Sequence, residues 1–283
     1  MRHPMFLAAC IAGVTAVAGC EQKNGNETVE RAFKDVNVVD ETNLSDVMLT
    51  VADPNEAVSY FARSLKQSPD RIDFQRGLAS SLIRAKRVTE GVAEWEKVTK
   101  MPEATQDDSV EYADALIRSG NWARAEKVLD KIPPTHETFK RYRLEALVAD
   151  SQQDWKKADS FYEIAIGLTT TPASVMNNWG YSKLTRGSYA DAERLFSDAI
   201  RQDPTLFTAK NNLVLARSAQ RDYSLPVIPM DQTERAQLLH TMALSAIKQG
   251  DVETGKGLLR EAIDTHPQHF EAAVRSLRAL EAS

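Results

Sequence analysis

The stretch Ala173–Leu206, ASVMNNWGYSKLTRGSYADAERLFSDAIRQDPTL, decides the fold of this chain. Its apolar residues recur at helical spacing on both sides of a short turn at Arg186-Gly187-Ser188, which predicts two amphipathic helices. Asp203-Pro204 ends the second helix, because proline has no N–H to donate and disfavours helix at the residue before it. Small residues stand wherever the two helices would touch, so the stretch predicts a closely packed helical hairpin.

The same pattern recurs along most of the chain and resembles the tetratricopeptide (TPR) repeat, a helix–turn–helix unit of about 34 residues. Counted in this register, units begin at Ile72, Gln106, Phe139, Ala173 and Phe207. The resemblance implies an all-α solenoid, a right-handed superhelix of antiparallel helix pairs. Aromatic residues such as Trp155 and Tyr162 are expected to fill the space between helices. The small residues expected at the helix contacts are Ala79, Gly91, Ala113, Ala125, Ala146, Ala158, Ala165, Gly180, Ala192, Ala199, Ala243, Gly255 and Ala262.

The composition suits a helical body and excludes several classes of function. The chain of 283 residues is 42% hydrophobic and carries few glycines and prolines. Its formal net charge is −5, and its lysines and arginines are dispersed, so no nucleic-acid-binding patch is expected. Downstream of the N-terminus, no apolar run approaches the length of about 18 residues that a membrane-spanning helix needs.

The first residues have the pattern of an export signal. Arg2 and His3 precede an apolar run that ends in Val17-Ala18-Gly19-Cys20, the layout of a secretory signal peptide. The last four residues resemble the bacterial lipobox, in which the cysteine becomes the acylated first residue of the mature protein. An ordinary signal peptide with an incidental cysteine is the alternative. Several acyl chains on Cys20 would give a stable membrane anchor.

The remaining N-terminal features agree with a lipid-anchored protein of the periplasm. Glu21, rather than aspartate, follows Cys20, which by analogy with lipoprotein sorting favours the outer membrane, at its periplasmic face. Cys10 would leave with the signal, so the mature body would hold no free thiol, no disulfide and no thiolate metal site. The expected organisation is a signal peptide at 1–19, an acylated tether at 20–37, a TPR array at 38–220, an extended insertion and helix start at 221–235, and a C-terminal TPR with a capping helix at 236–283.

The insertion carries a second, narrower resemblance. Pro226 and Pro229 forbid regular helix where a second helix should follow the unit at Phe207, and Asp231 with Glu234 predicts a capping box that opens the next helix. The apolar run Leu225–Met230 can cover the space left by the missing helix or dock a partner. The run and Thr233–Leu239, together with the lipobox, resemble TadD-like lipoproteins of the Tad (tight adherence, Flp pilus) system. That resemblance implies a pilotin-like protein that helps the Tad secretin, or another pilus-assembly component, to assemble.

A TPR stack forms a groove lined by its first helices, and this groove is the candidate binding site. Paired asparagines recur one repeat apart, and asparagine offers both a donor and an acceptor to the backbone of an extended peptide. Lys140 and Arg143 are candidates for binding a carboxylate. The alternative is that these residues are solvated polar positions on amphipathic helices, which would show the same sequence pattern. The candidate groove residues are Arg76, Lys140, Arg143, Asn177, Asn178, Tyr181, Asn211, Asn212 and His240.

Other chemistry has little support in the sequence. His240, His266 and His269 lack the spacing of a metal site and a clear carboxylate partner, and Gly255-Lys256-Gly257 lacks the context of a phosphate loop. No nucleophile and base recur together, so we expect no enzyme, no cofactor, no metal and no small-molecule substrate. The alternative function is a periplasmic TPR lipoprotein that regulates a cell-envelope enzyme acting on peptidoglycan.

Overall fold

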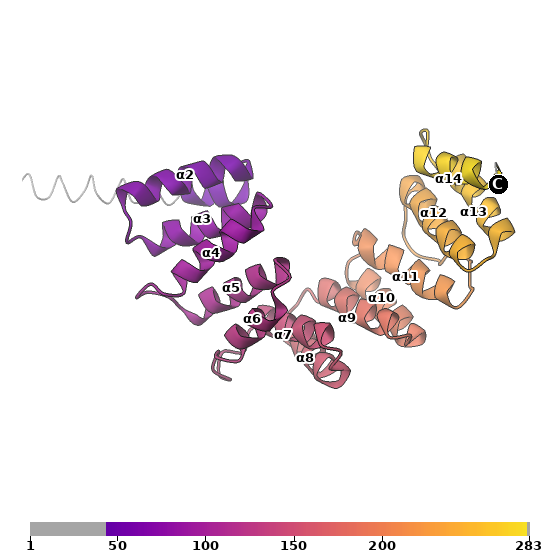
Figure 1. The fold of residues 1–283 in the computed structure, drawn as a ribbon. Coiled ribbons are helices and arrows are strands. Elements are labelled where there is room, and N and C mark those ends of the chain that lie inside the picture. Colours follow the sequence, from indigo (N-terminus) through magenta and orange to yellow (C-terminus); the bar gives the residue numbers. More distant parts are fainter. Residues whose placement is uncertain (1–43, 282–283) are drawn as a thin grey trace, which may run out of the picture.

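The computed structural model describes residues 44–281, and these residues form a curved array of helices (Figure 1). Residues 44–50 are helical and precede the first labelled helix. The helices that follow are α2 (Pro54–Gln67), α3 (Ile72–Arg84), α4 (Val88–Val98), α5 (Gln106–Arg118), α6 (Trp122–Leu129), α7 (Phe139–Ser151), α8 (Trp155–Gly167), α9 (Ala173–Thr185), α10 (Tyr189–Gln202), α11 (Phe207–Ala219), α12 (Gln232–Lys248), α13 (Val252–Thr265) and α14 (Glu271–Glu281).

The helices pack mainly on their neighbours in the sequence, so the described chain is a solenoid, as the sequence predicts. In Figure 1 the array runs in one direction from α2 to α14, with α6 to α8 at the lowest part of the arch and the two ends apart. The helix pairs are joined by tight turns. Gly187 and Gly250 lie in these turns with φ of 80° and 85°, the left-handed region that favours glycine.

Helix contacts are as close as the small residues allow. All the alanines and glycines expected at helix contacts are buried. A Cβ at Gly180 would lie 2.7 Å from a ring carbon of Phe196, and a Cβ at Gly255 would lie 2.4 Å from Ile247. These distances are shorter than any real contact, so the glycine is what lets each helix approach its partner. Gly255 therefore serves packing within its repeat.

The insertion has no helix from residue 222 to residue 231. Tyr223, Leu225 and Met230 pack against the core between α11 and α12, and Ile228 packs against the core of α10 and α11. Val227 and Pro229 of this run are exposed. The segment therefore covers apolar surface that a second helix would otherwise cover.

The predicted capping box opens α12. The Asp231 side chain accepts a hydrogen bond from the Glu234 N–H, and the Glu234 side chain accepts one from the Asp231 N–H. Glu234 also accepts a hydrogen bond from Lys210 at 2.8 Å, and Lys210 is only 2% exposed. This ion pair ties α11 to α12 across the insertion.

Three earlier expectations lie outside the described residues: the signal peptide, acylation of Cys20 and the tether. The start of the first unit, residues 38–43, lies outside them as well. Within 44–281, no helix is long and apolar enough to cross a membrane.

Candidate functional site

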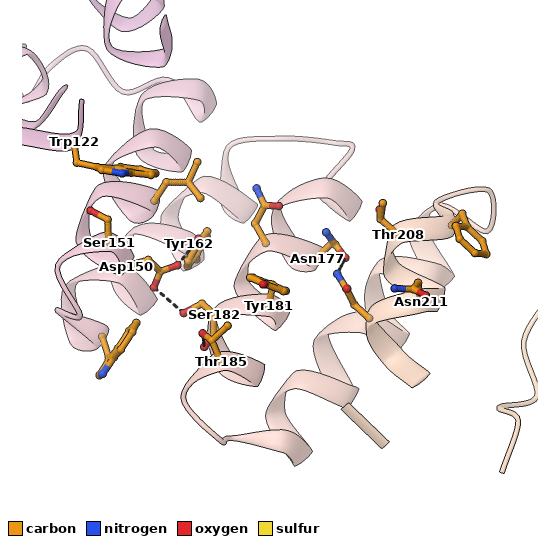
Figure 2. Close-up of a pocket in the computed structure, with 15 residues that line it drawn as sticks. Trp122, Asp150, Ser151, Tyr162, Asn177, Tyr181, Ser182, Thr185, Thr208 and Asn211 are labelled. Carbon is orange, nitrogen blue, oxygen red and sulfur yellow. Dashed lines mark hydrogen bonds between the residues drawn. The ribbon is translucent and has the colours of Figure 1, made fainter. Parts of the chain in front are cut away.

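A cavity opens on the face formed by the first helices (Figure 2). It has a volume of about 560 Å³ and draws its lining from α6, α7, α8, α9 and α11. The lining combines aromatic and aliphatic side chains with amides, hydroxyls and one carboxylate. The lining residues are Trp122, Leu147, Asp150, Ser151, Trp155, Tyr162, Asn177, Asn178, Tyr181, Ser182, Thr185, Phe207, Thr208, Asn211 and Asn212.

A second cavity of about 470 Å³ continues from the first towards α12. Tyr181 lines both cavities, and it is 52% exposed although it is a large aromatic residue. Leu147, Tyr181, Leu215 and Leu244 occupy equivalent positions of successive first helices, and all of them line one cavity or the other. The two cavities therefore form one groove with an apolar row along it, which we call the central groove.

The asparagines of the central groove form hydrogen bonds from helix to helix, one with another asparagine and one with a threonine. The Asn212 Nδ2 donates to Asn177 Oδ1 at 3.0 Å, and Thr241 Oγ1 donates to Asn211 Oδ1 at 2.8 Å. These bonds run from α9 to α11 and from α11 to α12, and Figure 2 shows the first of them. Each uses one polar atom of an amide that has two. The side chain of Asn178 has no hydrogen bond to another described residue. Amide donors and acceptors thus remain available to a ligand along the groove.

A carboxylate lies in the same cavity. Asp150 accepts hydrogen bonds from Tyr162 Oη and from Ser182 Oγ, both at 2.7 Å (Figure 2). Burial raises the pKa of Asp150, and these bonds together with the charge of Arg186 offset only part of the effect. The pKa of Tyr162 is raised well above its usual value by burial and by the Asp150 charge. Tyr162 therefore stays a neutral donor, and it fixes Asp150 to the floor of the cavity.

The basic candidate residues lie outside the cavity lining. Arg76 forms a two-bonded ion pair with Asp108 of the next unit, at 2.6 and 2.7 Å. Lys140 contacts Glu111 at 2.6 Å and Asp114 at 3.2 Å, so both its partners already lie within the array. Arg143 is half-buried, and its Nε has no hydrogen-bond partner within the described chain. A ligand carboxylate at Lys140 would have to compete with two protein carboxylates.

His240 lies apart from the other candidates. Its ring packs on Phe270 with centroids 5.3 Å apart, beneath the start of α14, and burial lowers its pKa. His266 stacks on the same phenylalanine with ring centroids 4.9 Å apart, and His269 contacts Glu271 at 2.9 Å. The described residues hold no cluster of three or more histidine, cysteine or acidic side chains that would suit a metal ion.

Comparison with known proteins supports the repeat assignment. The tetratricopeptide repeat family matches residues 44–108, and a second tetratricopeptide repeat family matches residues 237–269. Residues 44–108 and 237–269 are thus tetratricopeptide repeats, and the described chain has the solenoid fold of such repeats. No match to a curated protein was found. This repeat fold is typical of non-catalytic scaffolds that bind other proteins.

Solved structures support the same fold. A chain of the APC/C hetero-tetramer Cut9–Hcn1 superposes with a TM-score of 0.61 at 11% identity, over 83% of this chain and 48% of that one. This protein thus spans about half the length of that chain. A tetratricopeptide repeat protein from Parabacteroides merdae gives a TM-score of 0.55 at 13% identity, over 91% of this chain and 100% of that one. A TPR protein from Thermus thermophilus gives a TM-score of 0.53 at 16% identity, over 62% of this chain and 95% of that one. At these identities the similarity shows the fold alone.

Most lining residues of the larger cavity were not among the candidates from the sequence, and Trp122, Asp150 and Trp155 are three of them. Trp155 was expected to be a packing residue, yet it lines the cavity, as does Trp122. Both tryptophans begin the second helix of their repeat, and this recurrence is a signal that the sequence does contain. Asp150 gave no such signal, because its partners Tyr162 and Ser182 lie on two other helices.

Proposed function

We propose that this protein is a scaffold whose central groove binds an extended segment of a partner polypeptide. The observation that carries the proposal is the continuity of the groove across α7, α9, α11 and α12, with an apolar row beside a row of amides. An extended chain presents side chains and backbone polar groups along its whole length. The apolar row suits the side chains, and the amides suit the backbone.

The exposure of the apolar row supports a binding role. Tyr181 and Leu244 are among the large apolar side chains that remain exposed in the described chain, and both line the groove. Large apolar side chains gathered in one concavity are typical of interaction sites, whereas scattered ones are ordinary surface.

We further propose that the partner is the secretin of a Tad pilus system and that the protein is held at the outer membrane by acyl chains on Cys20. The support for this is the resemblance of the lipobox, of Leu225–Met230 and of Thr233–Leu239 to TadD-like lipoproteins. In this arrangement the tether places the groove beside a secretin subunit, where binding of an extended segment would favour assembly of the pore.

Replacing Cys20 with serine is expected to remove the anchor, because acylation needs the thiol. The variant should leave the outer-membrane fraction, and the secretin multimer should fall to the level of a strain without the protein. The measurement is membrane fractionation with detection of the secretin as multimer and monomer. Cys10→Ser is the matched control, since Cys10 lies within the apolar run of the signal. A normal amount of secretin multimer in the strain without the protein would refute the Tad proposal.

A further inference from the structure

Asp150 is the one residue of the acidic and basic types (Asp, Glu, Lys, Arg, His) among the described residues lining the larger cavity. Every other lining residue is apolar, aromatic, an amide or a hydroxyl. The cavity thus offers a ligand a single negative charge and no positive one. Charge complementarity excludes an acidic side chain from this cavity and favours a basic one.

The Asp150 carboxylate has unused hydrogen-bonding capacity. Each of its oxygens accepts one hydrogen bond, from Tyr162 and from Ser182, whereas a carboxylate oxygen has two lone pairs. Both donors are neutral, so the partly buried charge has no ion-pair partner in the described chain. Burial accordingly raises the pKa of Asp150. A cation in the cavity would relieve this cost.

The nearby cation Arg186 is held elsewhere. It forms an ion pair with Asp159, which also accepts hydrogen bonds from Trp179 at 2.6 Å and from Lys183 at 2.9 Å. The Arg186 guanidinium lies over the Trp155 ring, 5.4 Å from its centroid. Arg186 therefore pairs with Asp159, not with Asp150, and its charge acts on Asp150 without a direct contact.

The walls of the cavity suit the rest of a basic side chain. Trp122 and Tyr181 come from α6 and α9, and Asp150 comes from α7, so aromatic rings from separate helices line the same cavity as the carboxylate (Figure 2). Lysine and arginine bury their aliphatic stems on such surfaces, and their charged groups are attracted to aromatic faces. A volume of about 560 Å³ is ample for one such side chain together with neighbouring backbone.

We propose that the larger cavity is a subsite for one lysine or arginine side chain of the bound polypeptide, with Asp150 as its ion-pair partner. This inference rests on the proposed binding of a polypeptide in the central groove. It adds a sequence requirement: a basic residue within a segment whose neighbouring side chains are apolar and lie on Leu147, Tyr181, Leu215 and Leu244.

The test selects displayed random peptides on the full-length lipoprotein in detergent, in parallel on the wild type and on Asp150→Asn. Asparagine keeps the size of the side chain and an acceptor, and circular dichroism checks that the variant is folded. Asp191→Asn is the matched control, because Asp191 is an exposed aspartate of α10 outside the cavity. Selected peptides are then synthesised with their lysine or with norleucine, which keeps the stem and removes the charge.

The expected result is enrichment of lysine or arginine on the wild type and on Asp191→Asn, but not on Asp150→Asn. The wild type should bind the lysine peptide about tenfold more tightly than the norleucine peptide, as expected for a partly buried ion pair, and Asp150→Asn should bind the two alike. Peptides that bind the groove without a preference for lysine would overturn the subsite and leave the groove proposal standing. If Asn177→Ala weakens the binding of none of the selected peptides, both the subsite and the groove proposal are overturned.

Discussion

Replacing Glu234 with alanine is expected to destabilise the junction of α11 and α12 by about 3–5 kcal/mol. Glu234 is the ion-pair partner of Lys210, whose side chain is only 3% exposed. Without the carboxylate the lysine ammonium would remain buried and unpaired, which costs far more than an exposed ion pair contributes. The variant also loses the half of the capping box that binds the Asp231 N–H.

The measurement is urea denaturation together with hydrogen exchange, which should show the loss of protection concentrated in α11 and α12. Glu261→Ala is the matched control, because Glu261 pairs with Arg235 on the surface of the same region, where both side chains are about half exposed. Glu261→Ala should lower the free energy of unfolding by about 1 kcal/mol or less. Adding Lys210→Met to Glu234→Ala should recover part of the stability. Equal effects of Glu234→Ala and Glu261→Ala would show that the buried pair has no special role.

Replacing Phe196 with alanine is expected to lower the free energy of unfolding by about 3–5 kcal/mol. The ring is fully buried, and its removal leaves a cavity between α9 and α10. In a solenoid each unit contacts only its neighbours, so hydrogen exchange should rise chiefly from α9 to α11. Leu168→Ala serves as the control, since Leu168 is exposed after the end of α8 and its truncation should change stability by about 0.5 kcal/mol or less.

The same site permits a test of the Gly180 contact. Gly180→Ala should destabilise the wild type, because its Cβ would overlap the Phe196 ring. In the Phe196→Ala background the same methyl group would fill part of the cavity and should be tolerated. The two substitutions are therefore expected to be non-additive. Additive effects would mean that the close approach of α9 and α10 does not depend on this pair.

Much of the fold follows from local signals in the sequence. The expected starts of first helices at Ile72, Gln106, Phe139, Ala173 and Phe207 are confirmed by α3, α5, α7, α9 and α11. Helical periodicity, small residues at contacts and the proline that ends a unit all lie within one repeat, so the sequence displays them directly. The capping box at Asp231 and Glu234 is equally local, and it is confirmed.

The site was less visible because its contacts join residues far apart in the sequence. The sequence predicts Arg76 as a groove residue, but it does not show the ion-pair partner Asp108, which lies 32 residues away on the next first helix. Trp155 looked like an ordinary packing residue, because only the assembled array shows that it borders a cavity. The register of the repeat did place the asparagines on the groove face. Binding by those asparagines stays a prediction.

The role of the central groove in secretin assembly is tested most directly by replacing Asn177 and Asn211 together with alanine. The measurement is the amount of secretin multimer in the outer-membrane fraction, compared with Gln202→Ala and Gln232→Ala, which remove two exposed amides outside both cavities. We expect the groove variant to be folded and present in the outer membrane while the multimer falls at least about tenfold, as the loss of two or more hydrogen bonds predicts. A wild-type amount of multimer with the folded groove variant would contradict the proposed role of the groove.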